Sequence, residues 1–247
     1  MSVFWGLIWG MVTVLIMMLT MKYYLPVLSR RAKKAASEVP ETLSGESEDL
    51  SPERETWEKP EAFLLADPRM RLFIWICCAL FACFCGYSAS EHAVSGVSLL
   101  RMTLTYAVLC CVFITDLEFY LIPNLCSVAL LAARGITVIL ELILLPDSAM
   151  LCLIDSIVAL VICLILLLIM ALITRGGIGM GDVKLFSCIG FMSGIRAVCF
   201  TLVIAFLACA MVSTVLLLMK KRQPKDVLPM GPFIWIGFGV SVLLAII

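Results

Sequence analysis

Long apolar runs make up most of this sequence, and one extended polar segment interrupts them. The runs cover residues 3–21, 72–89, 98–115, 124–145, 151–173, 184–195, 197–219 and 229–247. A helix needs roughly 20 residues to cross the hydrocarbon core of a bilayer, and most of the runs approach or exceed that length. The pattern therefore predicts an all-α polytopic membrane protein with about eight transmembrane helices.

The run at 184–195 is shorter than the others and contains Gly190 and Gly194. Glycine lets two helices approach each other closely inside a membrane protein. We therefore expect this run to form a short, buried or tilted helix.

The composition agrees with the membrane assignment and excludes a soluble enzyme. Of the 247 residues, 63% are hydrophobic and 15% are charged, whereas soluble domains are about half apolar and about a quarter charged. The formal net charge is zero, which argues against a nucleic-acid partner. The expected surrounding is the lipid bilayer of a cell membrane.

The runs divide the chain into a first helix (1–21), a polar segment (22–71) and a membrane domain (72–247). No basic residue precedes the first run and no small-residue cleavage site follows it, so we expect an uncleaved helix with its N-terminus outside. The polar segment holds nine basic and ten acidic residues.

Lysine and arginine fall mainly on one side of this topology. With the N-terminus outside, the inner segments are 22–71, 116–123, 174–183 and 220–228. These segments and the adjoining Lys184 hold fifteen of the eighteen basic residues, while Arg101 and Arg196 lie near the outer side and Arg134 falls within a span. The positive-inside rule favours this orientation, which places both polar clusters described next on the cytoplasmic side.

The first polar cluster covers residues 115–124, Thr-Asp-Leu-Glu-Phe-Tyr-Leu-Ile-Pro-Asn. A long apolar run ends at Asp116, and Pro123 suits the first turn of the following helix, with Asn124 beside it. Taken alone, Asp116 is typical of a carboxylate that ends a membrane span.

The second polar cluster covers residues 175–184, Arg-Gly-Gly-Ile-Gly-Met-Gly-Asp-Val-Lys, and an apolar helix is expected to resume just after Asp182. Its four glycines allow a tightly curved backbone that can approach a peptide closely. A phosphate-binding loop and a plain connecting loop are alternatives. The dinucleotide pattern GxGxxG is absent, however, and no strand precedes the loop.

Together the clusters place two aspartates at cytoplasmic helix ends of an otherwise uncharged bundle. Ionisable groups at membrane depth are costly and indicate function. Two carboxylates at close range share a proton, so one can act as a base on water while the other protonates a scissile carbonyl. The single histidine, His92, is on the other side, so no Ser/His/Asp set is available. A small proton-coupled transporter, in which the pair relays protons, is an alternative.

The sequence resembles the type IV prepilin peptidase family in three segments. Residues 179–185, Gly-Met-Gly-Asp-Val-Lys-Leu, resemble the family's GxGD motif, and Asp116 with Leu-Ile-Pro-Asn at 121–124 is similar to its first aspartate segment. Leu-Pro-Met-Gly-Pro-Phe at 228–233 resembles the proline-glycine stretch that opens the last helix. The resemblance covers about 72–247.

The resemblance implies a membrane aspartic endopeptidase with eight spans and no cofactor. Such enzymes cleave the basic leader from prepilins and pseudopilins, whose leader precedes an apolar helix, at the cytoplasmic face after a glycine. By resemblance, Asp116 and Asp182 are the catalytic pair. The positions expected to support the site or bind substrate are Gly179, Gly181, Lys184, Pro123, Asn124, Pro229, Gly231 and Pro232. Another GxGD protease, of the preflagellin type, is the nearest alternative.

The polar segment departs from many bacterial members of that family, which carry two zinc-binding CxxC pairs in the first cytoplasmic loop and also N-methylate the product. Residues 22–71 contain neither Cys nor His, so no metal site is expected there. The missing pairs also argue against methylation, although they need not be its catalytic machinery. The twelve cysteines lie nearly all in apolar runs and contain no CxxC, which is typical of small core residues.

The remaining charged residues have simpler interpretations. Arg134 and Glu141 are seven residues apart on one helix face, which favours an intramembrane ion pair, or a partner on another helix for each, over substrate binding. Asp155 is expected at the outer interface. Lys184 fits both the motif and interfacial snorkelling. Glu118 fits a solvated loop acid better than a contact with a basic leader.

Overall fold

The structure is a computed structural model that describes residues 2–24, 68–92, 95–174, 177–219 and 228–244. Within these residues the chain is helical and contains no β-strand. The helices are α1 (Ser2–Leu19), the π-helical turn η1 (Thr20–Tyr24), α4 (Pro68–His92), α5 (Gly96–Phe119), α6 (Asn124–Leu144), α7 (Pro146–Ile173), α8 (Met180–Ser193), α9 (Ile195–Leu218) and α10 (Gly231–Leu243). Each predicted apolar run coincides with one α-helix, so the all-α prediction is confirmed.

Four of the helices, α5, α6, α7 and α9, are long and apolar enough to cross a membrane, and shorter apolar stretches occupy Trp75–Ala89 and Gly231–Leu243. The chain is therefore a multi-pass membrane protein, while the count of eight spans stays a prediction. Most of the polar segment 22–71, including the part on which the prediction of no zinc site depends, lies outside the described residues.

Three predicted helix starts are wrong by four or five residues, and one of them is α4, which begins at Pro68 instead of residue 72. The other two are α8 and α7. The helix expected at 184–195 begins at Met180, so Asp182 lies inside its first turn instead of before it. The helix expected at 151–173 begins at Pro146, where the fixed φ of proline suits a first helical position. In all three cases the first helical residues include polar residues, glycine or proline, and a search for apolar runs misses them.

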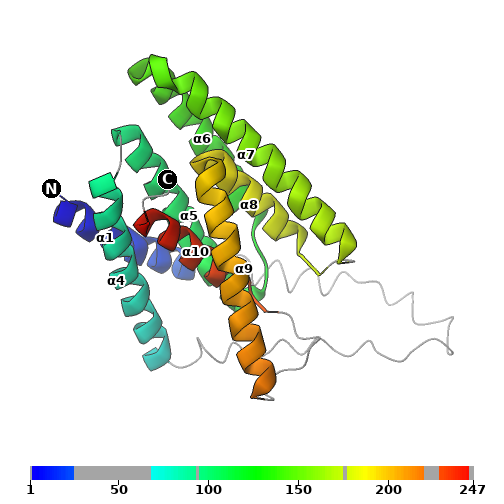
Figure 1. Cartoon of the computed structure of the whole chain (residues 1–247). Coiled ribbons are helices and arrows are strands. Elements are labelled where there is room, and N and C mark those ends of the chain that lie inside the picture. The colour runs from blue at the N-terminus through cyan, green and yellow to red at the C-terminus, as the bar shows by residue number, and fades with distance from the viewer. Residues whose placement is uncertain (1, 25–67, 93–94, 175–176, 220–227, 245–247) are drawn as a thin grey trace, which may run out of the picture.

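Helix α10 lies at the centre of the bundle, between α4 and α5 on one side and α9 on the other (Figure 1). Helix α1 packs along α4 and also touches α5. Helix α8 packs on α7, α6 and α9, and it joins the long α6–α7 pair to the rest of the molecule.

An aromatic cluster fixes α10 against α5 and α4. The ring centroid of Trp235 lies 5.4 Å from Tyr106, 5.3 Å from Phe113 and 4.9 Å from Phe81, and its Nε1 donates a hydrogen bond to Cys110 Sγ at 3.3 Å. Such ring pairs contribute roughly 0.5–1.5 kcal/mol each beyond their burial. The register of α10 against α5 is therefore set one turn after α10 begins.

A buried ionic cluster joins α5, α6 and α7 near the N-terminal end of α5. Arg134 is fully buried and donates through Nη1 to both Glu141 oxygens at 3.0 Å. Its Nη2 donates to Ser156 Oγ on α7 at 2.8 Å, and Arg101 on α5 pairs with Glu141 Oε1 at 3.3 Å. The predicted ion pair is confirmed, and it also gains partners from two neighbouring helices.

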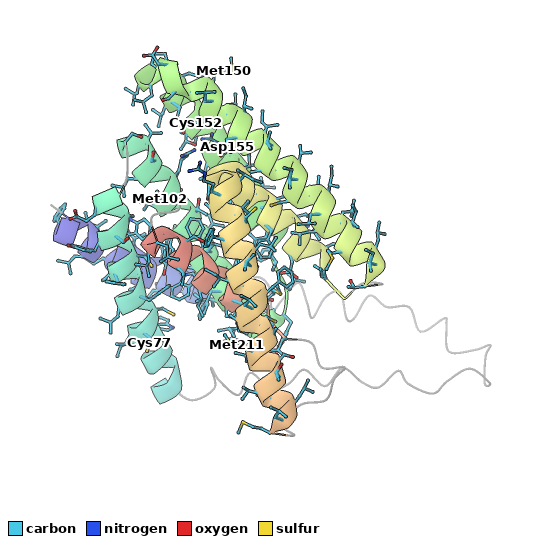
Figure 2. All side chains as sticks on the ribbon, viewed as in Figure 1. Cys77, Met102, Met150, Cys152, Asp155 and Met211 are labelled. Atoms are coloured by element: carbon cyan, nitrogen blue, oxygen red, sulfur yellow. The ribbon has the colours of Figure 1, made fainter. Side chains whose placement is uncertain are left out.

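Asp155 lies where α7 passes the beginning of α9 (Figure 2). Its Oδ2 accepts the Ile195 N–H at 3.3 Å, so the carboxylate lies at the positive end of α9. Gly194 has a φ of +86°, and a Cβ there would collide with the Asp155 carboxylate. Gly190 lets α8 approach α7, since its Cβ would lie 3.2 Å from the Ala159 carbonyl oxygen. The close approach expected of both glycines is confirmed.

Candidate active site

Asp116 lies in the last turn of α5 and is 5% exposed. The helix ends three residues later, where Tyr120 adopts a left-handed conformation with φ 51° and its N–H donates to the Asp116 carbonyl at 2.9 Å. The carboxylate Oδ2 accepts the backbone N–H of Gly231 at 2.5 Å. Asp116 is thus held between the end of α5 and the beginning of α10.

Asp182 is the third residue of α8, and a reciprocal backbone arrangement holds it there. Its own N–H donates to the Gly179 carbonyl at 3.0 Å, while the Gly179 backbone hydrogen-bonds the Asp182 carboxylate. The reach of the third helical residue back to the N-cap is one half of a capping box, and the glycine N-cap has no side chain to make the other half. A Cβ at Gly179 would lie 3.0 Å from Asp182 Oδ2, so glycine leaves room for the carboxylate.

The second carboxylate oxygen of Asp182, Oδ1, is buried and has no protein hydrogen-bond partner. Burial, together with the negative charge of nearby Asp116, raises the pKa of Asp182 to about 7, against a smaller lowering by the Gly179 hydrogen bond. A buried acceptor without a partner is uncommon and needs a reason. Here the oxygen is oriented to take a proton, a water or a substrate group.

The fold brings the two polar clusters together at one end of the bundle. A Cβ on Gly181 would lie 3.2 Å from the Cβ of Ile122, so α8 begins directly against the loop that follows α5. The charge of Asp116 is close enough to act on Asp182. The predicted convergence of residues 66 positions apart in the chain is therefore observed.

Two carboxylates lie close together in this apolar bundle, Asp116 buried and Asp182 half-buried, and this limits their charge states. Both cannot carry a charge cheaply, so they hold one proton between them. The ionised member can take a proton from water, and the protonated member can donate one to a carbonyl oxygen. The arrangement can therefore hydrolyse a peptide bond without a covalent intermediate.

The other predicted positions fall into two groups. Gly179, Gly181 and Gly231 touch the aspartates or the loop between them, as described above. Pro123 is buried at the N-cap of α6 with φ −67° and not within its first turn, so that expectation is corrected. Of the rest, Pro229 and Pro232 are half-buried at the start of α10, while Asn124 and Lys184 are exposed. Lys184 makes no ion pair with either aspartate.

Two features of the site could not be inferred from the sequence. Cys209 on α9 lies near enough to Asp182 to be affected by its charge, yet in the sequence it looks like any other cysteine of an apolar run. The hydrogen bond from Gly231 to Asp116 joins residues 115 positions apart. The proline-glycine stretch indicated a motif there but not what it touches.

Comparison with protein families gives a match to the type IV leader peptidase family over residues 103–214. The matched region contains both Asp116 and Asp182 and ends before α10 begins. Curated proteins and solved structures gave no match. The match confirms the family resemblance and favours a peptidase over the transporter alternative. Over residues 103–214, the chain is therefore similar to the type IV leader peptidase family, and this similarity supports a peptidase.

Proposed function

We propose that this peptidase removes the short basic leader from prepilin-like substrates, in which the leader precedes an apolar helix, and that it does so at the cytoplasmic face of the cell membrane. The observation that carries the proposal is the convergence of Asp116 and Asp182 at one buried end of an apolar bundle. A substrate helix can reach this site from within the bilayer while its charged leader stays in water.

In the proposed reaction, one carboxylate takes a proton from water as the water oxygen bonds to the scissile carbonyl carbon. The other carboxyl group gives its proton to the carbonyl oxygen, which forms a neutral gem-diol. The C–N bond then breaks as the first group returns its proton to the nitrogen, and a gem-diol hydroxyl returns a proton to the second group. Both aspartates end in their starting states, so no cofactor is consumed.

The cytoplasmic side rests on the distribution of Lys and Arg. In a Cys-free background, a single Cys replacing Glu48 in the polar segment should be shielded from an impermeant thiol reagent in intact cells. A Cys replacing Ser95, in the connection before α5, should react. If both cysteines are labelled equally fast, the proposed orientation is wrong.

The activity is tested with purified protein in detergent micelles and a synthetic peptide that has a basic leader, a glycine and an apolar helix. Cleavage after the glycine is expected. A matched peptide with the leader lysines replaced by glutamine should be cut more slowly, and a preflagellin-type peptide tests the nearest alternative. If no leader peptide is cut while an unrelated membrane peptide is, the proposed substrate class is wrong.

The polar segment gives the proposal two further consequences. Because residues 22–71 offer no Cys or His, chelators should leave cleavage intact. Mass spectrometry of the product, with S-adenosylmethionine present, should show no added methyl group. Loss of cleavage in a chelator with recovery on adding zinc, or a methylated product, would contradict these two expectations separately.

A further inference from the structure

The two aspartates have different surroundings, and the difference comes from the backbone N–H groups that reach them. Asp116 lies at the C-terminal end of α5, where unpaired carbonyl groups give a partial negative charge that disfavours a carboxylate. The first helical residue of α10, Gly231, points its N–H at Asp116 Oδ2. The positive end of α10 therefore lies against the Asp116 carboxylate and favours its charged form, which the end of α5 disfavours.

The close approach of α10 requires a glycine at this position. A Cβ on residue 231 would lie 2.9 Å from Asp116 Cβ, 3.0 Å from its Oδ2 and 3.2 Å from the Val112 carbonyl oxygen. Any other residue would push the helix or the carboxylate away. The Trp235 contacts with α5, one turn further along, keep α10 at this distance.

Both carboxylates lie at a positive helix end, since Asp182 is in the first turn of α8, but their hydrogen-bond partners differ. Asp116 accepts the backbone N–H groups of Gly231 and Met230, whereas Asp182 accepts that of Gly179. One of its oxygens meets the Gly179 backbone, and the other is buried without a partner. Since a hydrogen bond from a backbone N–H favours the charged form of a carboxyl group, the pair is asymmetric.

We propose, on the basis of the proposed function, that the Gly231 N–H at the start of α10 holds Asp116 as the ionised member of the pair. Asp116 is then the base that takes the proton from water, and Asp182 is the acid that protonates the carbonyl oxygen. Gly231 is a positioning residue that acts through Asp116.

The titratable groups around the pair do not offer another origin for this asymmetry. Helix α10 has no titratable side chain. The other groups on neighbouring elements are Cys126 on α6, Lys184 on α8, Cys209 on α9 and, on α5 itself, Cys111 and Glu118. Serine at Cys126 should leave both limbs of the pH–rate profile in place.

The most direct test deletes the N–H alone. Replacing the amide between residues 230 and 231 with an ester, by cell-free incorporation of the hydroxy acid, removes the donor and adds no bulk. The acidic limb of kcat/KM should move to higher pH by about one unit or more, because a charge-assisted hydrogen bond to the base is lost. An unchanged acidic limb would overturn the proposal.

Gly231→Ala gives the same shift together with a steric loss, and α10 offers a matched control. Gly237→Ala puts a Cβ 2.6 Å from the Thr201 carbonyl oxygen, away from Asp116, whereas Gly135→Ala on α6 meets nothing within 4 Å. Gly237→Ala should lower stability without moving the pH profile, and Gly135→Ala should change neither. If Gly231→Ala and Gly237→Ala shift the pH profile equally, Gly231 acts only through packing and the proposal is wrong.

Infrared difference spectroscopy separates this assignment from the proposed function. In a pH titration, the carboxylic-acid C=O band that wild type loses near pH 7 should also be present in Asp116→Asn, displaced to lower pH because the Asp116 charge no longer raises the Asp182 pKa, and should be missing in Asp182→Asn. The reverse pattern would overturn the assignment even with a proven protease. If instead both Asn variants cleave substrate normally, the proposed function itself fails.

Discussion

The two ends of α5 carry buried charge in opposite ways. Near its beginning, Glu141 on α6 pairs with both Arg101 and Arg134, at 3.3 Å and 3.0 Å. Fifteen residues after Arg101, roughly 22 Å along the helix, Asp116 lies near the like-charged Asp182. Both ends place ionisable groups in an apolar bundle, but one end pairs opposite charges and the other brings two acids together.

The two charged sites therefore differ in what they contribute to the molecule. A buried charge with oppositely charged partners holds helices in register, and removing one partner costs several kcal/mol. A buried pair of like charges stabilises nothing and persists where chemistry requires it. The ionic cluster therefore anchors α6 and α7 to α5, whereas the aspartate pair has the role in catalysis that we propose.

The largest expected effect on stability is at the ionic cluster. Glu141→Gln leaves Arg134 and Arg101 without a carboxylate, and we expect a loss of about 3–5 kcal/mol in the free energy of unfolding. Thermal unfolding in detergent micelles measures it, with Asp147→Asn on the exposed first turn of α7 as the matched control. Asp182→Asn, at the other end, should be at least as stable as wild type. If the Glu141 and Asp147 variants are equally stable, the ionic cluster does not stabilise the fold as we expect.

The second expected effect is on the pH dependence of cleavage. Burial raises the pKa of Asp182 to about 7, so below that pH the pair keeps the proton that the reaction needs. As the pH rises through 7 the proton is lost, and kcat/KM should fall about tenfold per unit. A rate that stays constant to about pH 9, or that rises, would show that cleavage needs no proton on the pair.

The smallest expected effect is at the contact that joins the two clusters. Gly181→Ala puts a Cβ 3.2 Å from Ile122, so the loop and α8 must separate by a few tenths of an ångström. Misplacing one carboxylate by that amount should lower kcat/KM by about tenfold with little change in KM. Gly135→Ala, which faces open space, is the control. Wild-type activity in Gly181→Ala would show that this contact does not set the geometry.

Much of this molecule can be predicted from its sequence because its signals are local. Apolar runs give the helices, and the spacing of Arg134 and Glu141 places both on one face of α6. Asp116 and Asp182 stand out because few other charges occur within the apolar runs.

The features that could not be predicted depend on contacts between distant segments. Ser156 and Arg101 join the ionic cluster from other helices, and neither has a periodicity that indicates it. The bond from Gly231 to Asp116 depends on how α10 packs, which Trp235 and its aromatic neighbours decide. The start of α8 was misplaced because a glycine-rich, polar first turn resembles a loop.

The central claim is that Asp116 and Asp182 act as one catalytic unit, and a double-mutant comparison tests it most directly. Leader-peptide cleavage is measured for wild type, Asp116→Asn, Asp182→Asn and the double variant, each checked for folding by its melting temperature. Each single variant should lose several orders of magnitude in kcat/KM, and the double variant should be little worse than either single one, as for groups that act together. Losses that multiply in the double variant, or wild-type cleavage by either single variant, would contradict the account.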